Sequence, residues 1–325
     1  MQAARQAPLF SFGNVRLTNE FFTVRQSSEA LAAWLDQKPS SWGRALSARL
    51  ALRVAPNLAN LQSICFRDGD EAAVERILLG ALRTLFAAWA QSAYPQLSDE
   101  NQRRRMCEII SALLAASEAA EKSFLDPYPA LNDYHISAIC EQQHGAYRTM
   151  RLILNALEPR PFVSFRFHPA ERPGLDDPFN TVVPFGPESY ENVARWRVML
   201  CESIADDMEY LVRGSEEQPE RQLMFEPLWR RRKDEALALS FQWRDSSNLC
   251  RKFPDFIYWL EERASGCLVL AKEPEDSSAR IAKIVALPDA FWEQPLDKLK
   301  SDIWQAFMHS ADSPFWSSTW QTNAL

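Results

Sequence analysis

Hydrophobic residues recur at intervals of three and four in two long stretches between Asp68 and Phe124. A period of 3.6 residues places such positions on one side of a helix. Tyr94-Pro95 interrupts the pattern between the two stretches. The spacing therefore predicts two helices that pack antiparallel, each with one buried and one solvated face. In the first helix the predicted buried stripe is Val74, Ile77, Leu78, Ala81, Leu82, Leu85, Ala88 and Trp89, and the predicted solvated side is Glu71, Glu75, Arg76, Arg83 and Thr84.

Similar patterns predict helices on both sides of this pair. One begins near Ser41 and carries three arginines (Arg44, Arg49 and Arg53) on a different side from its leucines. These arginines would either meet a phosphate or an acidic partner, or form a solvated helix face. Further helices are predicted at about 131–157, from about 188 to a stop at Gly214, and around 296–307.

Apolar and polar residues alternate in several short stretches of the second half, as a two-residue strand period requires. The clearest is 236–243, and 267–271 with 280–287 is typical of a hairpin. Two shorter strands are predicted at 162–167 and 181–185. The predicted fold class is α+β and predominantly helical: an N-terminal antiparallel helical bundle, then a mixed region with a small antiparallel or mixed β-sheet covered by helices.

Proline content changes sharply after residue 157, and seven of the twenty prolines lie between 159 and 187. This shift predicts a helical domain at 1–157, a Pro-rich bridge at 158–187 and an α+β domain at 188–325. The two domains either fold separately or pack as one unit.

Charge and composition narrow the function classes. The 325 residues carry a net charge of −7, with 14 basic against 12 acidic residues in 1–125 and 22 against 31 in 126–325. The acidic second half disfavours general affinity for nucleic acid. No apolar run approaches the roughly 18–20 residues that span a bilayer, and no apolar signal core occurs near residue 1, so no membrane association and a cytoplasmic location are expected.

The bridge contains the densest mixture of ionisable groups beside rigid backbone. Long irregular segments of this kind often carry function. One hypothesis gives His168 the role of acid or base, Asp176 or Asp177 the role of its carboxylate partner or a divalent-metal ligand, and Arg166 or Arg172 that of an anion clamp. The alternative is a solvated connector with surface ion pairs, since the spacing does not force these groups together.

Candidate binding residues lie elsewhere. Trp229 precedes Arg230, Arg231, Arg232 and Lys233, a basic cluster that would suit a phosphate backbone with aromatic stacking. The aromatic tail contains Trp316 and Trp320, which would either enter the core or anchor another protein. Asp206, Asp207 and Glu209 are expected on the outer side of their helix, where solvation or an arginine-bearing partner would accommodate them.

These patterns favour a non-enzymatic interaction protein, such as an adaptor, an inhibitor or an immunity-like component, that binds a protein partner through helical and acidic or aromatic surfaces. An enzyme using residues 166–188 is the first alternative, and a nucleic-acid-binding subunit using Arg230 to Lys233 is the second. No common catalytic or metal motif occurs, so no cofactor and no metal are predicted. The oligomeric state is not determined by the sequence.

Overall fold

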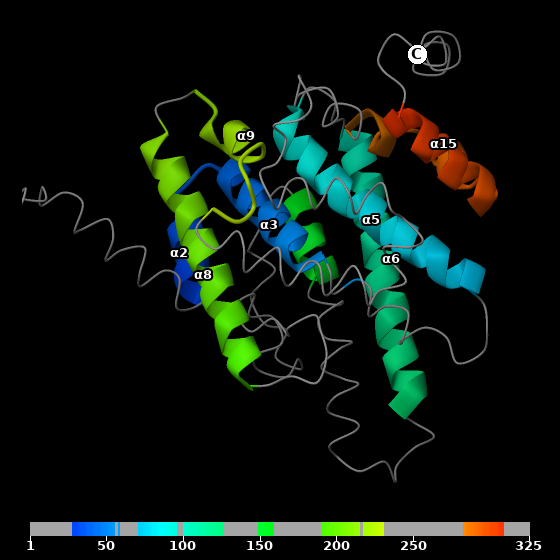
Figure 1. Ribbon diagram of the computed structural model, residues 1–325, viewed down its shortest axis with the longest axis horizontal. Helices are drawn as coiled ribbons and strands as arrows, with labels where there is room; N and C mark the ends of the chain where they lie inside the picture. The colour runs from blue at the N-terminus through cyan, green and yellow to red at the C-terminus, as the bar shows by residue number, and fades with distance from the viewer. Residues whose placement is uncertain are drawn as a thin grey trace, which may run out of the picture.

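The computed structural model describes residues 28–55, 58, 71–95, 100–125, 149–158, 190–214, 217–230 and 282–308. The regular structure of these residues is helical (Figure 1). Its elements are α2 (Ser28–Leu35), α3 (Ser40–Val54), α5 (Glu71–Ala93), α6 (Glu100–Leu125), a helical segment at 149–157, α8 (Tyr190–Arg213), α9 (Pro219–Leu223), a helical turn at 282–285, α14 (Asp289–Trp292) and α15 (Leu296–Met308).

Helices α3 and α5 form the centre of the fold. The layers follow the order α8, α3, α5 and α6, and α9 closes one end by contacting α3, α5 and α8 (Figure 1). Every residue of α3 from 45 to 54 is buried. A helix with small and apolar residues on all sides can be enclosed on all sides, and Ala45, Ala48 and Ala51 allow its neighbours to approach closely.

The predicted antiparallel helix pair is confirmed. α5 ends and α6 begins on either side of a short connection, and Gly80 near the middle of α5 faces Ile109 and Leu113 near the middle of α6. The two helices must therefore run in opposite directions. The helices predicted at 188–214 and 296–307 are also confirmed, as α8 and α15.

The predicted solvated face of α5 is wrong at its centre. Arg83 and Thr84 are 5% and 0% exposed. The Thr84 hydroxyl donates to the Ala81 carbonyl at 2.9 Å, and Arg83 Nη1 donates to Asp289 Oδ1 at 3.0 Å, so both polar side chains have partners inside the protein. α5 is covered by α6 and the 282–308 region as well as by α3. Its continuous apolar run, Leu85–Ala90, places apolar side chains on several sides of the helix and so allows this burial.

The predicted β-sheet, and with it the α+β class, is contradicted, because the described residues contain no strand. The strand predicted at 280–287 can be compared directly: 282–285 form a helical turn, and the Ala286 amide donates to the Ala282 carbonyl at 3.2 Å. A short apolar run has no clear period, and burial of Ile284 and Val285 in the core decides its conformation. The other predicted strands, at 162–167, 181–185, 236–243 and 267–271, lie outside the described residues.

One hydrophobic core contains residues from both sides of the Pro-rich segment. Leu46 and Trp89 from the first half belong to the same buried cluster as Met208, Leu228 and Ile303 from the second. The bridge at 158–187 lies outside the described residues except for Glu158, so the division into 1–157, 158–187 and 188–325 stays a prediction.

The last described region, 282–308, is attached to α5 and α6 by ionic contacts. Asp289 pairs with Arg83 of α5 at 3.0 Å and with Arg105 of α6 at 2.7 Å. Lys300 of α15 pairs with Glu75 of α5. The Arg83 guanidinium also lies over the Trp292 ring, 4.6 Å from its centroid. These charged contacts add to the burial of Ile284, Val285 and Ile303 in the core and attach the region to α5 and α6.

Candidate functional site

A buried ion-pair cluster joins α3 to α8. Arg49 Nε and Nη2 donate to the two carboxylate oxygens of Asp207 at 2.9 and 3.0 Å, a bidentate arrangement. Arg53, one turn further along α3, places Nη2 2.7 Å from Asp207 Oδ2. The three side chains are at most 1% exposed. One carboxylate faces two guanidinium groups, so other acceptors must compensate the second charge.

Backbone carbonyl oxygens supply that compensation. They belong to residues 223–228, which begin with the last residue of α9 and are called here the pinned segment. Arg49 donates to the carbonyls of Leu223, Glu226 and Pro227 at 2.7, 2.8 and 2.7 Å, Arg53 donates twice to that of Leu228 at 2.9 and 2.7 Å, and Trp89 Nε1 donates to that of Met224 at 3.1 Å. With its two bonds to Asp207, Arg49 uses all five of its N–H donors.

The cluster is ionised at neutral pH. Burial opposes the charged form of Asp207, but the charges of Arg49 and Arg53 outweigh it and hold the pKa of Asp207 below its ordinary value. Burial lowers the pKa of Arg53 to about 10, which still leaves the side chain protonated near pH 7. The expectation that Asp206 and Asp207 lie on the outer side of α8 is therefore wrong. The arginine partner of Asp207 lies within the chain.

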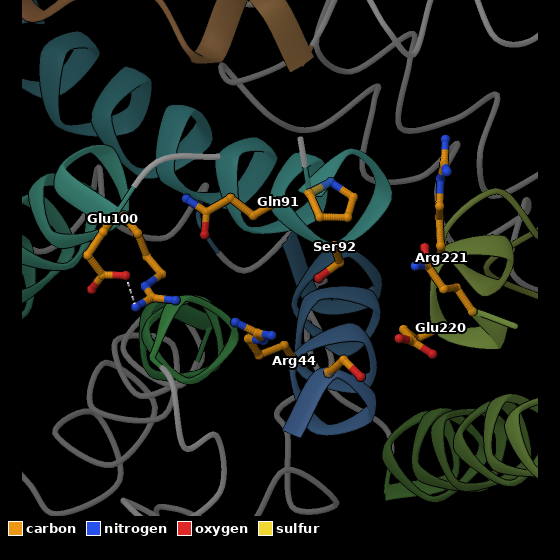
Figure 2. Close-up of a pocket in the computed structure, with 10 residues that line it drawn as sticks. Arg44, Gln91, Ser92, Glu100, Glu220 and Arg221 are labelled. Carbon is orange, nitrogen blue, oxygen red and sulfur yellow. Dashed lines mark hydrogen bonds and ion pairs between the residues drawn. The ribbon is translucent and has the colours of Figure 1, made fainter. Parts of the chain in front are cut away.

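A pocket of about 390 Å³ opens where α3, the end of α5, the start of α6 and α9 meet (Figure 2). Its lining is polar and of mixed charge. The lining residues are Ser41 and Arg44 from α3, Gln91 and Ser92 from the end of α5, Pro95 just after α5, Glu100 and Arg103 from α6, and Gln218, Glu220 and Arg221 around α9.

Arg44 differs from the other two arginines of this pocket. Arg103 pairs with Glu100, and Arg221 Nε donates to the Ala93 carbonyl at 3.2 Å. Arg44 is partly buried and has no hydrogen bond or ion pair with the described part of the chain. In Figure 2 it lies between Glu100 on one side and Glu220 on the other. The pocket therefore contains a guanidinium whose donors are available to a ligand.

The electrostatics of Arg44 agree with this geometry. Burial is the main cause that lowers the pKa of Arg44, and the nearby charge of Arg103 lowers it further. Glu220 and Glu100 act in the opposite direction without cancelling these effects. An anion beside Arg44 would stabilise its charged form.

Two of the predicted binding residues lie in the described part of the chain. Trp229 is 4% exposed, and the Arg53 guanidinium lies 5.7 Å from its ring centroid. Arg230 stacks on Tyr210 at 4.7 Å, and its Nε lies 3.7 Å from Glu226 Oε2. Both side chains thus make contacts within the chain, and partner binding by them stays a prediction.

The remaining predicted site residues lie outside the described residues, so no distance among them bears on the hypotheses. They are Arg166, His168, Arg172, Asp176 and Asp177 of the bridge, Arg231 and Arg232 of the basic cluster, and Trp316 and Trp320 of the tail.

The sequence predicts a shared role for the three arginines of α3, and the structure separates them. Arg49 and Arg53 are buried, and only Arg44 reaches the pocket. The apolar or small residues between the arginines indicate that α3 is enclosed. No local pattern identifies Asp207, 158 residues away from Arg49, as their counterion.

Comparison with protein-family models, with curated proteins and with solved structures finds no match for this chain.

Within the described residues, no helix combines the length and the apolar character needed to cross a membrane.

Proposed function

We propose that this protein is a non-enzymatic interaction protein that engages a protein partner at the pocket between α3, α5, α6 and α9. The observation that supports the proposal is Arg44, a partly buried guanidinium without a partner among the described residues, held at the wall of a pocket. Arginine presents a planar fork of donors that suits acidic groups of a partner. A cytoplasmic location belongs to the same proposal.

The ionisable lining of the pocket suits binding better than proton transfer. Its ionisable side chains are three arginines, which stay protonated at neutral pH, and two glutamates, of which Glu100 is paired with Arg103. Near the pocket, burial is the main cause that raises the pKa of the Cys107 thiol to about 11, which leaves it protonated rather than nucleophilic. The enzyme hypothesis for residues 166–188 and the nucleic-acid hypothesis for Arg230 to Lys233 stay alternative predictions.

The test is affinity capture from the native host with three forms of the full chain: wild type, Arg44→Gln and Arg104→Gln. Arg104 is the matched control, because it lies on α6 with its side chain 72% exposed and is absent from the pocket lining. A partner identified by mass spectrometry should bind wild type and Arg104→Gln, both from lysate and after purification. Arg44→Gln should weaken that binding about tenfold or more.

Two results would contradict the proposal. One is a purified partner that binds Arg44→Gln as tightly as wild type. The other is a specific substrate turnover by the purified chain that Arg44→Gln abolishes while the helical circular dichroism spectrum is unchanged.

A further inference from the structure

We infer that the group of the partner that enters the pocket is a single carboxylate, bound by Arg44. This inference rests on the proposed function and specifies the chemistry of the contact. A carboxylate offers two oxygen acceptors in the plane of a guanidinium, so the pair can be bidentate. Arg49, five residues further along α3, binds Asp207 with this bidentate geometry.

The charge of the lining selects the ligand. Three arginines and two glutamates give the pocket a formal charge of +1. A carboxylate would neutralise it. A phosphate group carries about −1.5 to −2 charges near pH 7 and would leave an excess of negative charge beside Glu100 and Glu220. Because like charges at close range are repulsive, the two glutamates disfavour a phosphate more than a carboxylate.

The neutral lining and the volume favour a peptide rather than a small free anion. The pocket lining also includes Ser41, Ser92, Gln91 and Gln218, whose hydroxyl and amide groups can hydrogen-bond to peptide units. The volume of about 390 Å³ exceeds the needs of one carboxylate. Peptide units adjacent to the carboxylate would fill the rest of the pocket. The carboxylate would come from a chain terminus or from an Asp or Glu side chain.

The test follows the Arg44 guanidinium in the full chain, labelled with ¹⁵N-arginine. Its Nε–H signal is assigned by its absence in Arg44→Gln. The probes are acetyl-Gly-Gly-Gly with a free carboxylate, acetyl-Gly-Glu-Gly-amide, acetyl-Gly-Gly-Gly-amide and inorganic phosphate. At least one carboxylate peptide should shift the Arg44 signal saturably, the neutral amide should not, and phosphate should bind more weakly. The free-acid peptide reports a chain terminus, and the Glu peptide reports an acidic side chain.

Variants test the role of Arg44. Arg44→Gln should raise the Kd of the active peptide, followed through the Arg103 signal, by about tenfold or more. Arg44→Lys keeps the charge but loses the fork, so it should give an intermediate Kd. Arg104→Gln should leave the Kd unchanged.

Two outcomes would overturn the carboxylate inference: phosphate binding more tightly than both carboxylate peptides, or an unchanged Kd in a folded Arg44→Gln variant. Either result leaves the proposed function to be decided by whole-partner capture. Conversely, partner capture that is insensitive to Arg44, together with carboxylate peptide binding that needs it, would contradict the proposed function and retain the carboxylate site.

Discussion

At the scale of single residues, the fold depends on charges that water does not reach. Asp207 of α8 is buried against α3, where it pairs with both Arg49 and Arg53. The net gain from forming such a buried ion pair is small, but removing one member is costly because the other charges remain buried. Without Asp207, Arg49 and Arg53 would remain buried and charged with no carboxylate partner.

Asp207→Asn should therefore lower the free energy of unfolding by about 3–5 kcal/mol. The substitution keeps the shape of the side chain and removes its charge. Urea denaturation followed by circular dichroism measures the change. Glu209→Gln is the matched control on the same helix: Glu209 pairs with Arg213, whose side chain is 54% exposed, and its loss should cost less than about 1 kcal/mol. Equal losses in the two variants would show that burial of the pair is unimportant.

At the scale of helices, two glycines have opposite roles. Gly80 lies inside α5, where an added Cβ would lie 3.6 Å from Leu113 Cδ1, an ordinary contact. Gly214 follows α8, where a Cβ would lie 2.8 Å from Pro219 Cβ and 3.2 Å from the Tyr210 carbonyl oxygen. Gly214 does not adopt the left-handed conformation that its place after the helix indicates, so the close approach of Pro219 is what requires glycine there.

Gly80→Ala should raise the free energy of unfolding by about 0.5–1 kcal/mol, because alanine favours the helix and the space is available. Gly214→Ala should lower it by about 1–3 kcal/mol, because Pro219 or the end of α8 must move. Both values come from urea denaturation of the full chain. A destabilised Gly80→Ala variant would mean that α5 and α6 pack more closely there than the structure shows.

The helices were predictable from periodicity where one face is apolar, as in α6, α8 and α15. Periodicity was less informative where burial is complete, as in α3 and the centre of α5, because an arginine that is paired inside the protein looks the same in a sequence as one in water. Arg83 illustrates the point: its partner Asp289 is 206 residues away. The pocket combines residues from four separate helices, so no local pattern predicts it, although Arg44 itself was recognised as a candidate.

At the scale of the whole molecule, acid should weaken the attachment of 282–308. Burial opposes ionisation of Asp289, but hydrogen bonds from Arg83 and Arg105 outweigh it and hold the pKa of Asp289 below its ordinary value of 3.8. The folded protein therefore binds the Asp289 proton less readily than the unfolded chain. The resulting stabilisation is complete well above pH 3.8 and is lost as the pH falls through the lower folded value. The pKa of Asp207 is also held below its ordinary value, so its contribution to stability is likewise lost in acid.

Asp289→Asn should thus destabilise the protein by about 1–2 kcal/mol at pH 7, and the difference from wild type should narrow as the pH falls below 3.8. Amide hydrogen exchange at pH 7 should accelerate in 282–308 while α3 and α8 stay protected. Asp297→Asn, in the first turn of α15, controls for the loss of one negative charge in the same region. If the difference in the free energy of unfolding between Asp289→Asn and wild type stayed constant with pH, Asp289 would not be the source of the acid sensitivity.

The pinned segment has a consequence for affinity. Carbonyls at 223, 224, 226, 227 and 228 each receive a hydrogen bond from α3 or α5, starting at the last residue of α9, the helix that supplies one side of the pocket. That side is therefore already ordered before anything binds. A peptide that binds in the pocket would lose its own conformational entropy, but binding would not have to order this part of the protein. Even a small contact there would therefore retain most of its intrinsic binding energy.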